Sequence, residues 1–209
     1  DANKIVATEL RRVLKDAEDE IVIFTPYFIP GERGIETISE ITGKGVRVVV
    51  LTNSLASNNH TSVHSAYASY RKRLLDAGVE LWEARANAAE VINEDGTREL
   101  EHLTLHTKGA IVDRRQVFVG SLNLDPRSTD LDSEIGLIID SPELGTRLVE
   151  NAMEGIPKMA YRLKLDENRK IRWHATIDDQ EVVETREPLT SWWRRFQAWF
   201  LKIAPEKQL

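Results

Sequence analysis

The chain has 209 residues, and its 28 basic and 34 acidic side chains give a formal net charge of −6. This balance disfavours a nucleic-acid binder, because such proteins usually carry a basic excess. The absence of cysteine excludes a disulfide framework and thiolate chemistry. No apolar run is long enough to span a bilayer, and the length suits one α/β unit with an appendage.

The first part of the chain alternates helical and strand patterns. Apolar residues at helical spacing predict a helix over residues 3–19, and buried strands are predicted at 21–24 and 46–51 with a helix between them. This order implies a parallel pair with a right-handed crossover. Residues 25–31 and Asn53 follow the ends of these strands, where ligands gather in open α/β sheets. Asn53 therefore either donates to a phosphate oxygen or caps a turn.

A third helix is predicted from about Ser62 to Ala77, followed by a strand at 79–83. Besides its apolar side, this helix has a polar stripe of His64, Tyr67 and Arg71 at helical spacing. The stripe either reaches a phosphate in the cleft or is an ordinary solvated face.

Beyond this strand, the pattern is first polar and then apolar again. Residues 85–103 are polar, with a turn signal at Asp95-Gly96, and predict an irregular excursion. After the strand at 135–139, a helix that ends near Met159 is expected to close the other face of the sheet.

The densest set of reactive side chains lies between Leu105 and Glu134. His106, Lys108 and Asp113 form the pattern H-x-K-x4-D on a predicted strand. Because side chains alternate along a strand, His106 and Lys108 should project to the same side. Two short strands are predicted at 110–112 and 117–119, and the second ends at a glycine that lets the backbone come close to a ligand.

These residue types suit a phosphate diester. The imidazole of His106 can attack or donate a proton, and the Lys108 ammonium supplies a fixed positive charge. Ser121 and Asn123 add neutral hydrogen-bonding groups beside them. Glu134 is expected to hydrogen-bond the far ring nitrogen of His106, as the orienting carboxylate of a catalytic triad does.

The segment HTKGAIVD followed by GSLN resembles the HKD motif of the phospholipase D superfamily. TPYFIPGERG, LTNSLASNN, VHSAYASYRKRLLDAGVELWE and FVGSLNLDPRSTDLDSEIGLIIDSP also resemble the C-terminal half of bacterial cardiolipin synthase-type proteins. The resemblance extends over residues 1–209 and departs from the common pattern at two places. Thr107 stands where alanine or serine is frequent, and Asp132-Ser133-Glu134 stands where Asn-Thr-Glu is frequent.

The resemblance implies an α/β fold: a phospholipase D-like domain over residues 1–160, with a mixed, mostly parallel sheet flanked by helices. Residues 161–209 would add a β-meander and an amphipathic helix. The resemblance also implies phosphodiester exchange by double displacement through a phosphohistidine, without a metal or other cofactor. His106 would be either the nucleophile or the acid that protonates the leaving alcohol.

The same resemblance assigns roles to the neighbours of His106. Lys108 and Asn123 would stabilise the equatorial oxygens of the phosphate, and Ser121 would support them. Asp113 would hold the strands in place rather than touch the substrate. Asn53 and the His64, Tyr67 and Arg71 stripe are the candidate substrate-binding groups.

One HKD motif supplies half of such a site, and the sequence contains no second H-x-K. The other half comes either from a second motif in a longer chain or from a second copy in a homodimer. The start at Asp1 rather than methionine favours the longer chain. The leading expectation is a cardiolipin synthase-like phosphatidyltransferase. The alternatives are a homodimeric single-motif phosphodiesterase or nuclease, and an inert isolated half.

The end of the chain has a different character. Residues 191–203 predict a helix with an aromatic stripe and basic neighbours, which fits the interface of an anionic bilayer. A helix docked on the domain with its tryptophans in the core is the alternative. The expected partners are phospholipid substrates, a membrane surface and a second HKD half, and no nucleic acid. The expected location is peripheral on the bacterial inner membrane, with the leaflet left open.

Overall fold

The computed structural model describes residues 5–92, 98–130 and 133–201. The described helices are α1 (Ile5–Lys15), α2 (Gly31–Gly43), α3 (Thr61–Asp76), α4 (Pro126–Asp130), α5 (Pro142–Met159) and α6 (Trp192–Leu201). The described strands are β1 (Glu20–Phe24), β2 (Arg47–Asn53), β3 (Glu80–Ala84), β4 (Ala89–Ile92), β5 (Arg98–Glu101), β6 (Gly109–Val112), β7 (Gln116–Gly120), β8 (Gly136–Asp140), β9 (Ala160–Leu165), β10 (Ile171–Ile177) and β11 (Gln180–Glu184).

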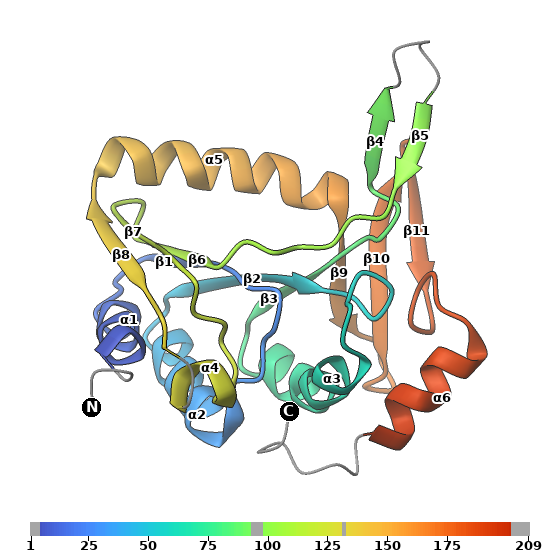
Figure 1. Ribbon diagram of the computed structural model, residues 1–209, viewed down its shortest axis with the longest axis horizontal. Coiled ribbons are helices and arrows are strands. Elements are labelled where there is room, and N and C mark those ends of the chain that lie inside the picture. Colours follow the sequence, from blue (N-terminus) through green and yellow to red (C-terminus); the bar gives the residue numbers. More distant parts are fainter. Residues whose placement is uncertain (1–4, 93–97, 131–132, 202–209) are drawn as a thin grey trace.

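Nine of these strands form one mixed sheet in the order β11-β10-β9-β3-β2-β1-β6-β7-β8 (Figure 1). The parallel strands β1, β2 and β3 are joined through α2 and α3, as the β-α-β pattern predicts. The mixed sheet is confirmed, but most of its pairings are antiparallel. The sequence overestimated the parallel part because antiparallel strands extend the sheet on both sides: β6, β7 and β8 beyond β1, and the C-terminal meander beyond β3. The expected domain boundary at residue 160 falls at the start of that strand.

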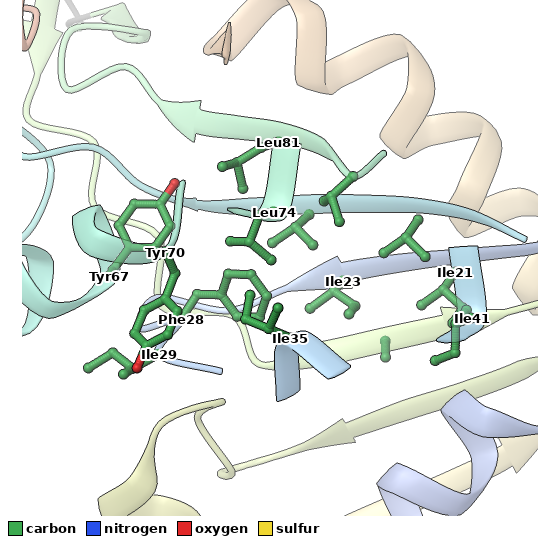
Figure 2. Packing of buried hydrophobic residues seen from close by; sticks show 14 of the residues in the cluster. Ile21, Ile23, Phe28, Ile29, Ile35, Ile41, Tyr67, Tyr70, Leu74 and Leu81 are labelled. Atoms are coloured by element: carbon green, nitrogen blue, oxygen red, sulfur yellow. The ribbon is translucent and has the colours of Figure 1, made fainter. Parts of the chain in front are cut away.

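Helices cover both faces of the sheet (Figure 1). α5 packs on one face against Val49 and Leu51, and α1, α2 and α3 pack on the other against Val48 and Val50. Because β2 is covered on both sides, its sequence is continuously apolar rather than alternating. Figure 2 shows the second of these layers, in which Phe28 and the side chains of α3 meet the strands.

The segment predicted as an irregular excursion contains a β-hairpin instead. β4 and β5 pair antiparallel and project from the domain (Figure 1). The prediction of an irregular segment was wrong because its polar composition gives no strand signal, although two short strands pair with each other there outside the main sheet. The predicted turn at Asp95-Gly96 lies outside the described residues.

The last helix, α6, lies against α3 at the end of the sheet where the meander is (Figure 1). Its buried side is small, since Ala198 is its buried residue. Within the described residues, no helix combines the length and the apolar character that crossing a membrane requires.

Candidate active site

The HKD segment meets the sheet where β1 ends. β6 runs antiparallel to β1, and Gly109 at its start pairs with Phe24 at the end of β1. β2 runs parallel to β1 and ends at the same edge. His106 and Lys108 precede β6, so they lie at the carboxyl ends of the parallel strands, where α/β folds place their ligands.

His106 and Lys108 do project together, as the alternation of side chains predicts. The Lys108 Nζ atom lies 3.3 Å from His106 Nε2 and donates a hydrogen bond to the His106 carbonyl at 2.8 Å. His106 is exposed, and Lys108 is partly buried. Desolvation lowers the pKa of Lys108 from its ordinary value, and the nearby Glu134 carboxylate opposes that shift. The pair offers an accessible imidazole beside an ammonium group.

Ser121 and Glu134 form the second part of this site. The Ser121 hydroxyl donates to the Glu134 carboxylate and accepts a hydrogen bond from the Ile135 amide at 3.0 Å. The Ser121 amide in turn donates to the Ile135 carbonyl at 2.9 Å. Gly120 is required here, because a Cβ atom at this position would collide with the Ile135 carbonyl. We call His106, Lys108, Ser121 and Glu134 the motif edge.

The predicted hydrogen bond from the His106 ring to the Glu134 carboxylate is not among those of the described residues. The reason is the register of β7 and β8, which pairs Gly120 with Gly136 and so places Glu134 beside Ser121. Glu134 therefore orients the serine hydroxyl and adds negative charge near Lys108.

The other two motif residues lie in different surroundings. Asp113 follows β6 at the far end from His106, and its carboxylate accepts hydrogen bonds from the backbone amides of residues 18, 19 and 20 at 2.9, 2.8 and 3.0 Å. It thus holds β6 to the start of β1, in agreement with the predicted structural role. Asn123 lies two residues after Ser121, and its Oδ1 atom is buried without a hydrogen-bond partner among the residues that the structure describes. A buried unpaired carboxamide oxygen is a group that a ligand or water can satisfy.

Asn53 is buried and bonded to the backbone. Its Nδ2 atom donates to the carbonyls of Leu105 at 3.0 Å and Pro26 at 3.3 Å, and its Oδ1 atom accepts from the Leu105 amide at 2.9 Å. The predicted donation to a phosphate oxygen gains no support from these contacts, since its two amide hydrogens face protein carbonyls. The sequence placed Asn53 at the correct edge but could not show what it contacts.

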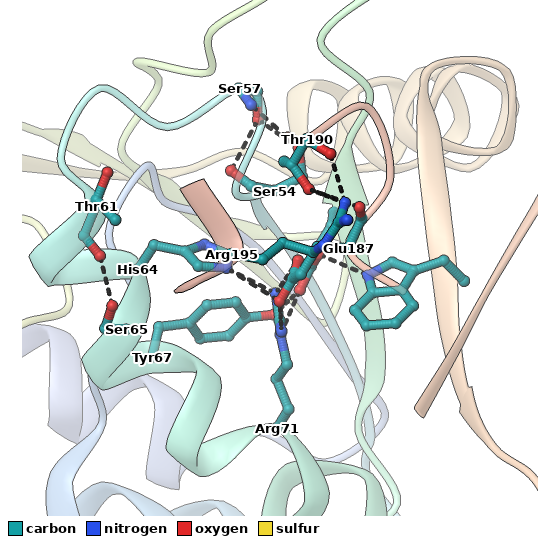
Figure 3. Close-up of polar contacts among 12 residues, drawn as sticks. Ser54, Ser57, Thr61, His64, Ser65, Tyr67, Arg71, Glu187, Thr190 and Arg195 are labelled. Carbon is teal, nitrogen blue, oxygen red and sulfur yellow. Dashed lines mark hydrogen bonds and ion pairs between the residues drawn. The ribbon is translucent and has the colours of Figure 1, made fainter. Parts of the chain in front are cut away.

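The polar stripe on α3 points into the protein. Figure 3 shows His64, Tyr67 and Arg71 converging on Glu187 from the segment before α6. The Arg71 Nε atom lies 2.7 Å from Glu83, and its Nη1 atom lies 2.5 Å from Glu187. We call His64, Tyr67, Arg71, Glu83 and Glu187 the α3 cluster.

The α3 cluster is closely bonded inside. The Tyr67 hydroxyl donates to Glu83 at 2.8 Å, and the Trp173 indole donates to the other oxygen of the same carboxylate at 2.9 Å. Burial raises the pKa of Tyr67 well above its ordinary value. Burial alone would also raise the pKa of Glu187, but Arg71 and His64 overcome it and hold that pKa well below its usual range.

The solvated-face alternative for the α3 stripe was therefore wrong. The other alternative, that the stripe contacts a substrate phosphate, stays a prediction. Arg71 already pairs with two carboxylates from other parts of the fold. Sequence reasoning missed Glu83, Trp173 and Glu187, because nothing local marks partners so far apart in the chain; Arg71 and Glu187 are separated by 116 residues.

A metal site is not evident in the described part of the chain. His, Asp and Glu side chains form no group of three or more there that could hold a metal ion. Among the four residues of the motif edge, Lys108 carries the permanent positive charge.

Two apolar surfaces lie exposed. On α6, five aromatic side chains project into solvent, and neighbouring rings stack on one another: Trp192, Trp193, Phe196, Trp199 and Phe200. The two arginines of this helix point elsewhere. Arg194 donates to the Asn58 carbonyl at 2.5 Å and Arg195 donates to the Thr190 carbonyl.

The second exposed apolar surface lies on the edge strand beside the motif edge. It consists of Val119 on β7 and Ile135 and Leu137 at β8. Val119 and Leu137 are cross-strand neighbours. We call these three residues the β8 face.

Comparison with known proteins identifies the fold and the family. Nuc from Salmonella typhimurium, described as a phospholipase D family member, superposes with a TM-score of 0.55 at 16% identity, covering 75% of this chain and 89% of Nuc. Phosphatidylserine synthase from Haemophilus influenzae Rd KW20 superposes with a TM-score of 0.54 at 22% identity, covering 76% of this chain and 37% of that protein. At these identities the likeness shows a shared fold.

The sequence comparison is more specific. Cardiolipin synthase C from Escherichia coli strain K12 is 32% identical over 209 residues, which are 99% of this chain and 44% of that protein. The chain thus spans less than half the length of this relative. Residues 10–155 match the family described as "Cardiolipin synthase, PLD-like domain". The chain therefore belongs to the cardiolipin synthase group of phospholipase D-like domains.

Proposed function

We propose that this chain is one catalytic half of a phosphatidyltransferase, which moves a phosphatidyl group from a phospholipid to a lipid alcohol. The observation that carries the proposal is the motif edge, where the exposed His106 imidazole lies 3.3 Å from the Lys108 ammonium. The similarity to a cardiolipin synthase supports a lipid substrate. An imidazole, a fixed cation and a bonded hydroxyl together suit a phosphorus centre that gains charge in its transition state.

The reaction proceeds as two displacements at phosphorus. An imidazole nitrogen attacks, the bond from phosphorus to the leaving alcohol breaks, and a proton donor on the opposite side protonates the leaving oxygen. The acceptor hydroxyl then attacks the phosphohistidine, gives its proton to that same donor, and frees the imidazole. His106 takes one of these two roles, and Lys108 and Asn123 stabilise the phosphate oxygens.

The role that His106 does not take belongs to a second HKD half. In-line displacement needs groups on both sides of phosphorus, and the chain contains one H-x-K. The β8 face supports this requirement, because an uncovered apolar edge strand beside the site is a typical binding surface for another protein unit. The 44% share of the relative's length favours a second half within a longer protein.

The aromatic surface of α6 would hold this half at the membrane. Tryptophan and phenylalanine side chains suit the interfacial region of a bilayer. Because Arg194 and Arg195 bond to backbone carbonyls, the attraction would come from aromatic burial rather than from pairing with anionic lipid. Lys202 and Ile203, at the end of the predicted helix, lie outside the described residues. We infer a peripheral location on the bacterial inner membrane.

A single-motif nuclease is the second candidate, because Nuc shares the fold and is covered over 89% of its length. The net charge of −6 and the aromatic surface of α6 favour lipid over nucleic acid.

The test is lipid product formation by the longest natural form of the protein, assayed with phosphatidylglycerol vesicles and, separately, with DNA. Wild type should convert phosphatidylglycerol to cardiolipin and glycerol and leave DNA intact. His106→Ala should abolish the conversion, whereas His102→Ala, a matched exposed histidine outside the motif, should retain it. Conversion that survives His106→Ala would refute the assignment, and DNA cleavage without lipid conversion would favour the nuclease.

A further inference from the structure

The segment that carries His106 is not part of a β-strand. Residues 102–108 precede β6 and carry no strand assignment in the described part of the chain, and β6 begins only at Gly109. The Gly120 amide of β7 donates to the Lys108 carbonyl at 3.2 Å, so the β6–β7 pairing reaches Lys108 but not His106. A backbone hydrogen bond from the Leu103 amide to the Ala86 carbonyl, 2.8 Å long, holds the start of this segment against the residues that follow β3. His106 itself is exposed, so its own side chain is not fixed by packing. The Lys108 ammonium bonds the His106 carbonyl, but it comes from a long side chain on the same segment, so a firmer restraint has to come from another part of the fold.

Asn53 supplies that restraint from the last position of β2. Its carboxamide donates to the carbonyl of Leu105 and accepts from the amide of the same residue, at 3.0 and 2.9 Å. These are the two bonds that an adjacent strand would make to one residue of a ladder. A third bond, 3.3 Å long, joins the same carboxamide to the Pro26 carbonyl. The side chain is only 1% exposed, so water does not compete for these groups.

We propose that Asn53 is a positioning residue for His106. Its carboxamide takes the place of the missing strand partner, fixes the backbone of Leu105, and thereby aims the next side chain at the substrate phosphorus beside Lys108. The inference rests on the proposed function for what His106 does, but not for how the segment is held.

The chemistry of the clamp requires asparagine. The carboxamide is the side chain that combines one acceptor and two donor hydrogens at this length. An ionised aspartate of the same shape would keep the bond from the Leu105 amide and turn negative oxygen toward two carbonyls. Alanine would remove all three bonds. Lys108 adjoins β6, so it should stay in place while His106 loses its alignment.

The experiment compares Asn53→Ala and Asn53→Asp with Thr52→Val in the 209-residue chain. Thr52 is the preceding residue, is equally buried, and bonds to the Pro26 carbonyl at 3.4 Å but not to Leu105, so it is a matched control. NMR measures hydrogen exchange at the Leu105 amide and the nuclear Overhauser contact between the His106 ring and the Lys108 side chain. Both Asn53 variants should lose the ring contact, and Asn53→Ala should also exchange the Leu105 amide at least ~10-fold faster.

Thr52→Val should retain both signals even where it lowers stability. If Asn53→Ala does not fold, the isosteric Asn53→Asp still tests the proposal through the contact between the His106 ring and the Lys108 side chain. A folded Asn53 variant with an unchanged ring contact would overturn the proposal.

Turnover of phosphatidylglycerol vesicles by the longest natural form gives the functional reading. Asn53→Ala should lower kcat by ~10²-fold, the cost of a misplaced reacting group, and leave KM within about twofold. Unchanged kcat with active wild type would overturn the positioning role. Wild type without lipid turnover would instead overturn the proposed function, while the NMR readings would still decide whether Asn53 holds the segment.

Discussion

The motif edge and the α3 cluster are built from similar side chains, each with a histidine, a cation, a hydroxyl and a carboxylate, yet the protein uses them differently. At the motif edge His106 is open to solvent, and within the described residues the Lys108 ammonium bonds a backbone carbonyl rather than a carboxylate. In the α3 cluster Arg71 meets two carboxylates, and its members are buried except Glu187, whose side chain is 17% exposed. Removing one partner of a buried charge pair leaves the other charge buried and unpaired, which destabilises the fold, whereas a charge that faces solvent is available to a substrate.

The comparison predicts that the two sets respond to mutation in opposite ways. Substitution in the α3 cluster should cost stability, and substitution at the motif edge should cost activity with little change in stability.

The largest stability effect is expected from Glu83→Gln, because it leaves Arg71 short of one buried partner. The free energy of unfolding should fall by about 3 kcal/mol. Glu80→Gln on the same strand is the matched control; its partner Arg47 is partly exposed, so a loss of about 1 kcal/mol or less is expected. Urea denaturation monitored by tryptophan fluorescence measures both. Equal losses for the two variants would show that burial of the α3 cluster is unimportant.

At the motif edge, Lys108→Gln should lower the rate of phosphatidyl transfer by ~10²-fold, since it removes the cation that faces the phosphate. Its free energy of unfolding should change by about 0.5 kcal/mol at most, because Lys108 is only partly buried. The assay is conversion of phosphatidylglycerol vesicles by the longest natural form of the protein. A fully active Lys108→Gln variant would remove Lys108 from the mechanism.

The pH dependence of stability isolates one carboxylate of the α3 cluster. The folded-state pKa of Glu187 lies below its ordinary value of 4.5, so its contribution is complete above pH 4.5 and is lost as the pH falls through the folded pKa. The difference in unfolding free energy between wild type and Glu187→Gln should therefore shrink by about 1 kcal/mol or more between neutral pH and pH 3. Urea titrations of both proteins at several pH values measure it. A constant difference would contradict the coupling to Arg71.

The smallest effect concerns the outer surface of α6. Trp192→Ala and Trp199→Ala should each weaken binding to phosphatidylglycerol vesicles by about tenfold, and Gln197→Ala on the same helix should not. Added salt should change the binding little, because Arg194 and Arg195 are engaged within the protein. Vesicle sedimentation gives the affinities. Binding that salt abolishes would assign the attraction to charge instead.

Local pattern was sufficient for most strands of the main sheet and for the long helices, but it missed the β4–β5 hairpin. Alternation along an extended segment also placed the side chains of His106 and Lys108 on one side, although that segment is not itself a β-strand. Local pattern was not sufficient for contacts that join distant segments. Glu187 lies in a polar stretch whose neighbours do not mark it, and only the packing of α6 on α3 brings it to Arg71. The partner of Glu134 could not be predicted for the same reason, since the register of β7 and β8 decides that it bonds Ser121.

The central claim is that His106 acts on the substrate while His64 maintains the fold. Its most direct test is one pair of variants, His106→Ala and His64→Ala, with transfer from phosphatidylglycerol vesicles and the free energy of unfolding measured for each. We predict that His106→Ala lowers transfer by at least ~10³-fold with stability unchanged, and that His64→Ala lowers stability by about 2 kcal/mol and retains transfer. Retained transfer in His106→Ala, or lost transfer in a stable His64→Ala protein, would contradict it.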